Sequence, residues 1–217
     1  NKDLIFLSLV TIAIYFCFKT FDKLGYKNIL IFSIFAALST SQRILGIFIP
    51  IAFVFFYFLS FLSNNKNGKD VGTILFFLIF YYLFLVIFWP YLWSGPFENF
   101  IVTIKFFSDH PLKIKQFFGG EYINVSHVPY NYIFTWILIS TPILYSVLFV
   151  VGYFQIFKRF FFKFLNIKNN VPYYDLWRGT NEKKDLFILF SISSIIFYLI
   201  AFNVLIYTGW RQIYFIN

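Results

Sequence analysis

The sequence is poor in charge, in cysteine and in histidine, and each deficit excludes a class of protein. Only 12% of its 217 residues are charged, about half of the roughly 25% that is usual in soluble domains. The one cysteine, Cys17, stands in an apolar run and cannot form an internal disulfide, and no Cys/His spacing is typical of a metal site. Glycine-rich phosphate loops and a Gly-x-Ser-x-Gly motif are also missing. We therefore expect neither a soluble domain nor a metal or cofactor site.

Apolar residues make up 60% of the chain, with 36 phenylalanines among them. Spanning a bilayer takes about 20 apolar residues as a helix. Ile29–Leu62 would form a helix of about 51 Å, which exceeds a bilayer core, so two helices joined near Arg43 fit better. The sequence therefore predicts an all-α, polytopic membrane protein with about six transmembrane helices. Their ranges are 4–18, 29–41, 44–62, 71–89, 133–157 with a kink at Pro142, and 186–207.

The net charge of +9 comes from basic residues between the apolar runs, so nucleic acid is not an expected partner. The loops 19–28, 63–70 and 158–185 carry twelve of the 18 Lys and Arg residues, and the remaining six fall on the other side. Cytoplasmic loops are enriched in Lys and Arg. We therefore place the segment 158–185 in the cytoplasm and the segment 89–133 outside, as one large outer loop.

The outer loop contains apolar residues at helical spacing, namely Phe97, Phe100, Ile101, Ile104 and Phe107. This pattern predicts a short amphipathic helix. Such a helix either lies flat in the membrane interface or packs against other outer loops, and the sequence does not separate the two. Gly119–Gly120 is then expected to break the chain.

Two arginines at the predicted outer membrane boundary are candidates for binding phosphate. Arg43 stands in SQRILG, and Arg211 follows the last complete span. The planar guanidinium suits phosphate or pyrophosphate, and two converging arginines would bind a doubly charged lipid phosphate. The alternative for each is a side chain that merely extends to the aqueous interface.

A second group of candidates lies where the outer loop returns to the membrane: Glu121, Tyr122, His127 and Tyr130. A carboxylate and an imidazole there could orient a hydroxyl group or bind a sugar. The alternative is a solvated loop with His and Tyr as interface anchors.

The motifs SQRILG, WPYLW, HVPY followed by a span with STP, and TGWRQIYF occur in this order between Leu38 and Phe215. Their order and membrane placement resemble the GT-C fold glycosyltransferases. The similar branch contains the protein O-mannosyltransferases and the lipid A aminoarabinose transferases. The resemblance makes residues 1–217 part of one transmembrane domain, and we interpret the chain as an internal piece of it.

The resemblance implies transfer of a sugar from a polyprenyl-phosphate carrier to a lipid, glycan or protein acceptor on the periplasmic or luminal face. Arg43 and Arg211 would stabilise the phosphate, and Glu121, Tyr122, His127 and Tyr130 would position sugar or acceptor. The family's catalytic carboxylate lies in a first outer loop that we expect upstream of residue 1, with Glu121 as the rival in this chain. We expect an integral, multi-pass protein of a bacterial inner membrane rather than of the endoplasmic reticulum. The alternatives are a polytopic transporter or lipid flippase, and a membrane scaffold.

Overall fold

A computed structural model describes residues 2–63, 68–108, 115–124, 129, 131–165 and 180–201. The described residues are mostly helical, which confirms the expected class. The helices are α1 (Lys2–Asp22), α2 (Tyr26–Gln42), α3 (Phe48–Ser63), α4 (Gly68–Phe88), α5 (Pro96–Ser108), α6 (Tyr132–Ser140), α7 (Ile143–Leu165) and α8 (Thr180–Ala201). Two 3₁₀ turns, η1 (Ile44–Ile47) and η2 (Pro90–Ser94), precede α3 and α5.

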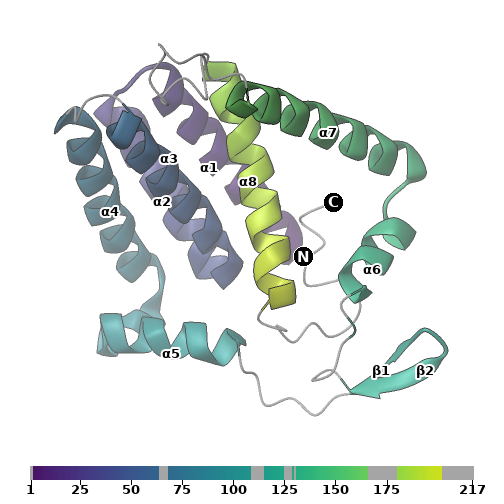
Figure 1. The fold of residues 1–217 in the computed structure, drawn as a ribbon. Coiled ribbons are helices and arrows are strands. Elements are labelled where there is room, and N and C mark those ends of the chain that lie inside the picture. Colours follow the sequence, from purple (N-terminus) through teal and green to yellow (C-terminus); the bar gives the residue numbers. More distant parts are fainter. Residues whose placement is uncertain are drawn as a thin grey trace.

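Helices α1, α2, α3, α4 and α8 lie side by side as a bundle (Figure 1). Its main core is unusually aromatic. Phe32 of α2 lies 4.8 Å from both Phe53 of α3 and Phe77 of α4, measured between ring centroids, and all three side chains are fully buried. Rings that interlock between three helices fix the relative positions of those helices.

Three described helices are long and apolar enough to cross a membrane, at Asp3–Asp22, Val71–Phe88 and Lys183–Ala201. The first is longer than the expected run 4–18, because the helix continues through Lys19 to Asp22. The expected division of Ile29–Leu62 is confirmed, since α2 ends at Gln42 and α3 begins at Phe48.

The expectation of a single kinked span over 133–157 is wrong. The chain divides into α6, which ends at Ser140, and α7, which begins at Ile143. Thr141 between them has extended backbone angles, φ −91° and ψ 131°. Proline lacks an N–H and disfavours helical angles in the residue before it, so Pro142 ends α6 rather than bending it. Figure 1 shows α7 crossing from α6 toward the first turn of α8, and most of its apolar side chains are exposed.

Helix α5 and a hairpin lie at the end of the bundle where α4 ends (Figure 1). The hairpin pairs β1 (Lys115–Phe118) with β2 (Glu121–Asn124) in antiparallel register. The sequence analysis expected only a break at Gly119–Gly120 here. The two glycines have positive φ of 64° and 93°, which is the backbone that a two-residue hairpin turn requires and that glycine adopts without strain.

The opposite end of the bundle carries the basic residues of α1, α7 and α8. Lys184 forms an ion pair of 2.7 Å with Asp22, and the ammonium of Lys183 lies 4.6 Å from the ring centre of Phe21. These contacts fasten the first turn of α8 to the last turn of α1. The predicted cytoplasmic loop 158–185 is therefore shorter than expected, because α7 extends to Leu165 and α8 begins at Thr180.

Candidate functional site

Arg43 stands at the junction between α2 and η1. Its backbone is extended, with φ −146° and ψ 131°. Its N–H donates to the carbonyl of Ser39 at 3.0 Å, and its own carbonyl accepts from the N–H of Gly46 at 2.8 Å. Both bonds hold the Arg43 backbone at the end of α2, so the side chain starts from a well-defined position.

Gly46 lets η1 fold back against the end of α2. A Cβ added at this residue would lie 2.7 Å from the carbonyl carbon of Ser39 and 2.8 Å from the nitrogen of Thr40. Both are backbone atoms, which cannot move aside as the end of a flexible side chain does. Thr40 is itself held, because its hydroxyl Oγ1 lies 3.0 Å from the hydroxyl of Tyr81 on α4, and both side chains are buried. The turn that presents Arg43 therefore requires glycine at position 46.

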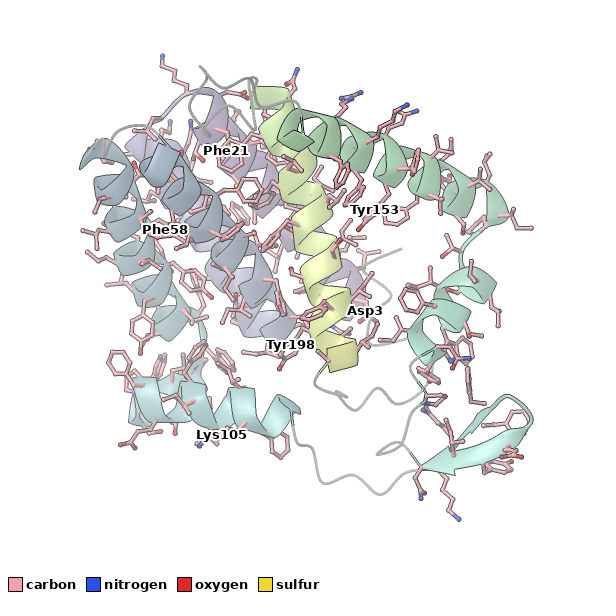
Figure 2. All side chains as sticks on the ribbon, in the orientation of Figure 1. Asp3, Phe21, Phe58, Lys105, Tyr153 and Tyr198 are labelled. Carbon is pink, nitrogen blue, oxygen red and sulfur yellow. The ribbon has the colours of Figure 1, made fainter. Side chains whose placement is uncertain are left out.

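The side chain of Arg43 forms an ion pair with Asp3, in the first turn of α1. The side chains retain 24% and 14% exposure, for Arg43 and Asp3 respectively. Figure 2 places Asp3 at the end of the bundle where α8 ends and Tyr198 lies. A partly buried pair interacts more strongly than a fully solvated one, because less water screens it. The structure thus brings a carboxylate and a guanidinium together at one end of an apolar bundle.

Sequence reasoning missed Asp3. The residue is separated from Arg43 by 40 positions, and only the antiparallel packing of α1 on α2 joins them. The available signal was an acidic side chain at the start of an otherwise apolar helix, which is costly within a membrane and points to a partner or a function.

A second core cluster connects the Arg43 turn with α6 and α8. Its buried members are Leu45, Tyr132, Ile133, Ile195 and Leu199. Leu45 belongs to the SQRILG motif, the two α6 residues follow the HVPY motif, and the last two belong to the final described helix. Two regions predicted to lie at the outer membrane boundary, the Arg43 turn and the start of α6, therefore share one packed core with the last described helix.

The hairpin presents Glu121 and Tyr122 to solvent. Both are exposed, Tyr122 at 75%, and the Tyr122 ring makes an edge contact of 5.4 Å with Phe117. The hairpin projects from the rest of the molecule (Figure 1). Among the described residues of the predicted site, Glu121 and Tyr122 are therefore the least enclosed.

The remaining predicted residues, Arg211, His127 and Tyr130, lie outside the described residues. Within the described residues, no group of three or more His, Cys, Asp or Glu side chains is placed to hold a metal ion.

No protein-family model, curated protein or solved structure matches this chain.

Proposed function

We propose that this protein is a membrane glycosyltransferase that moves a sugar from a polyprenyl-phosphate carrier to an acceptor on the outer or luminal face. The acceptor is a lipid, a glycan or a protein. The observation that carries the proposal is the Asp3–Arg43 pair, with its partly exposed side chains, at one end of an apolar bundle. Ionisable groups within membrane-spanning helices are costly, pair with one another and commonly mark a substrate site, and Asp3 begins the candidate span Asp3–Asp22.

In this reaction the acceptor hydroxyl oxygen attacks the anomeric carbon of the donor sugar. The bond from that carbon to the phosphate oxygen breaks, and its electron pair leaves with the lipid phosphate. Arg43 stabilises the negative charge that develops on the phosphate, as a fixed cation directed at the leaving group. A carboxylate accepts the hydroxyl proton and must lie within hydrogen-bond reach of it.

Asp3 becomes a candidate for that carboxylate, in addition to Glu121 and to a residue upstream of this sequence. It lies against the cation that would bind the leaving phosphate, whereas Glu121 is exposed on the projecting hairpin. A single ion pair would then serve both halves of the displacement, with Arg43 on the leaving group and Asp3 on the nucleophile.

The proposed orientation puts α5 and the hairpin outside. The described cations at the opposite end support it, since cytoplasmic ends are enriched in Lys and Arg. They include Lys19, Lys23, Lys27, Lys158, Arg159, Lys183 and Lys184. With several membrane-crossing helices and this orientation, the protein would be a multi-pass component of a membrane such as the bacterial inner membrane.

Helix α5 would lie along the outer membrane surface. It rests on the bundle through Phe100, which makes an edge contact of 6.5 Å with Trp89. Phe97 also stacks on Tyr82 of α4, with ring centroids 5.0 Å apart. The opposite side of α5 leaves Ile101, Val102 and Phe106 exposed beside Glu98 and Lys105. Apolar side chains flanked by charge suit the boundary between headgroups and acyl chains. Contact with membrane lipids would explain the exposed apolar side chains of α5, and packing on the bundle explains those on the side of Phe100.

A transporter or flippase is less well supported. Transporters place ionisable residues and broken helices near the membrane centre. The buried polar residues of the described helices are all Ser or Thr: Thr20, Ser33, Ser39, Thr40, Thr73 and Ser191. Most of them donate to carbonyls of their own helix, as Ser33 does to Ile29 at 2.8 Å. Such groups are satisfied within their own helices, unlike the ionisable residues that a transport pathway uses.

The deciding experiment reconstitutes the protein that carries this sequence in liposomes with polyprenyl-phosphate sugars. Formation of a glycosylated acceptor on the accessible face supports the proposal. Movement of the labelled carrier lipid between leaflets without glycosyl transfer would instead identify a flippase and overturn it.

A further inference from the structure

Two hydrogen-bond donors are buried where the hairpin meets α6. They are the amide Nε2 of Gln116 on β1 and the indole Nε1 of Trp136 on α6. Neither nitrogen has a hydrogen-bond partner within the described part of the chain. Buried Trp N–H groups usually find an acceptor, and each buried donor without one destabilises a protein by about 1–3 kcal/mol. Two such donors, on side chains that both contact Tyr132, call for a common explanation.

Tyr132 contacts both of the side chains that carry these donors. Its hydroxyl donates to Oε1 of Gln116 at 3.0 Å, which uses the acceptor of that amide and leaves Nε2. Its ring makes an edge contact with Trp136, with centroids 6.2 Å apart, and lies 4.9 Å from Phe118. Tyr132 itself is 1% exposed. The donors thus come from a strand and a helix, and Tyr132 and Phe118 pack beside them.

The chemistry of this cluster favours a neutral ligand that is rich in oxygen. Both donors are uncharged, and the charged residues of the hairpin, Lys115 and Glu121, are exposed near its two ends. A phosphate or carboxylate would be bound better by a guanidinium or an ammonium. Hydroxyl and ring oxygens can accept from neutral N–H groups, and aromatic rings offer an apolar surface to the C–H face of a sugar.

We propose that Gln116 and Trp136 form a subsite for a neutral sugar ring, whose oxygens accept the two hydrogen bonds. The proposal rests on the glycosyltransferase function for the origin of that sugar, as part of the donor or of the acceptor. It assigns sugar recognition to the hairpin–α6 junction, which is enclosed, instead of to the exposed side chains of Glu121 and Tyr122.

The test observes the Trp136 indole directly. The protein that carries this sequence is labelled with ¹⁵N at its indoles and held in lipid nanodiscs, because glycoside detergents would compete. Methyl α-D-mannopyranoside and methyl β-D-glucopyranoside are the probes, and inorganic phosphate is the comparison. A saturable shift of the Trp136 N–H resonance by at least one glycoside, and none by phosphate, supports the subsite. No shift with either glycoside, or an equal shift with phosphate, overturns it and leaves buried water as the partner of the two donors.

Matched variants separate binding from structure. Trp136→Phe keeps an aromatic ring and removes the N–H, so it should weaken glycoside binding about tenfold, the size of one hydrogen bond. Gln116→Glu keeps an oxygen for Tyr132 and removes the donor, and it should weaken binding similarly. Trp93→Phe is the control, because the Trp93 N–H already donates to the carbonyl of Val86 at 2.8 Å. Equal glycoside affinity in all three variants overturns the proposal.

Glycoside binding is measured without donor lipid, so its outcome is independent of transfer. If the protein binds the glycoside through Trp136 but transfers no sugar, the subsite proposal is supported and the transferase proposal is overturned. If the protein transfers sugar and Trp136→Phe has the same KM for donor and for acceptor as the unsubstituted protein, the transferase proposal is supported and the subsite proposal is overturned.

Discussion

Asp3 and Arg43 form an ion pair across 40 residues of sequence, between the first turn of α1 and the end of α2. This pair joins α1 to α2 at the start of α1, and the Lys184–Asp22 pair joins α1 to α8 at the end of α1. The two pairs differ in setting. Asp3 is 14% exposed and Asp22 is 48% exposed, so the pair at the proposed outer end is the more enclosed of the two and the better placed to act on a substrate.

Arg43→Ala should lower sugar transfer strongly. Loss of a charge-assisted contact to phosphate costs about 1.5–3 kcal/mol, which corresponds to a decrease of roughly 10- to 150-fold in kcat/KM. The control is Lys105→Ala, because Lys105 is an exposed cation at the same end of the molecule, and we expect less than about a threefold change there. Kinetics with a polyprenyl-phosphate sugar measures both. Equal, small effects would mean that Arg43 only extends to the interface.

Asp3→Asn distinguishes two candidates for the base. If Asp3 accepts the hydroxyl proton, kcat should fall by about 100-fold or more with little change in donor affinity, because general-base catalysis contributes about 10²- to 10⁴-fold. Glu121→Gln should then have a small effect, since that side chain is exposed on the hairpin. Loss of transfer in Glu121→Gln alone assigns the proton to the hairpin. Activity retained in both variants would mean that neither carboxylate accepts the proton.

Gly46→Ala should destabilise the protein and disturb the site. The added Cβ would lie 2.7 Å from a backbone atom of Ser39, and relieving such a clash in a packed region costs about 1–3 kcal/mol. Gly152→Ala in α7 is the control, because a Cβ there meets nothing within 4 Å. Alanine is favoured over glycine in a helix by up to about 1 kcal/mol, so the control should be neutral or slightly stabilising. Thermal unfolding in nanodiscs measures the stability of both variants. Equal unfolding midpoints for Gly46→Ala and Gly152→Ala would contradict the close approach of Gly46 to Ser39.

The proposed orientation can be checked by labelling introduced cysteines in intact cells with an impermeant maleimide. Cys17, the natural cysteine, is fully buried and should give little background. We expect Tyr122→Cys to react from outside, because it is an exposed hairpin residue. Lys23→Cys, in the turn after α1, should react only after permeabilisation. The opposite pattern would reverse the membrane orientation and remove the proposed site from the outer face.

Composition and pattern alone predicted the helical class, the presence of helices long and apolar enough to cross a membrane, and much of the order of elements. Helix formation satisfies backbone hydrogen bonds within each segment, so a long apolar run predicts its own helix without reference to other segments. The division of 29–62 near Arg43 followed from the same local argument and is confirmed. Helix lengths at chain ends and around Pro142 were less accurate, because the sequence does not show whether proline bends a helix or ends it.

Only the tertiary structure decided which polar groups meet. The sequence pointed to Arg43 and to Arg211, which lies outside the described residues, and the structure places Asp3 beside Arg43. The sequence also pointed to Glu121 and Tyr122. In the structure, the buried donors where the hairpin meets α6 belong instead to Gln116 and Trp136. These partners are set by the packing of α1 on α2 and of β1 on α6, and contacts between segments distant in sequence leave no trace in local periodicity. Apolar pattern therefore specifies the elements, and side-chain packing between them specifies the site.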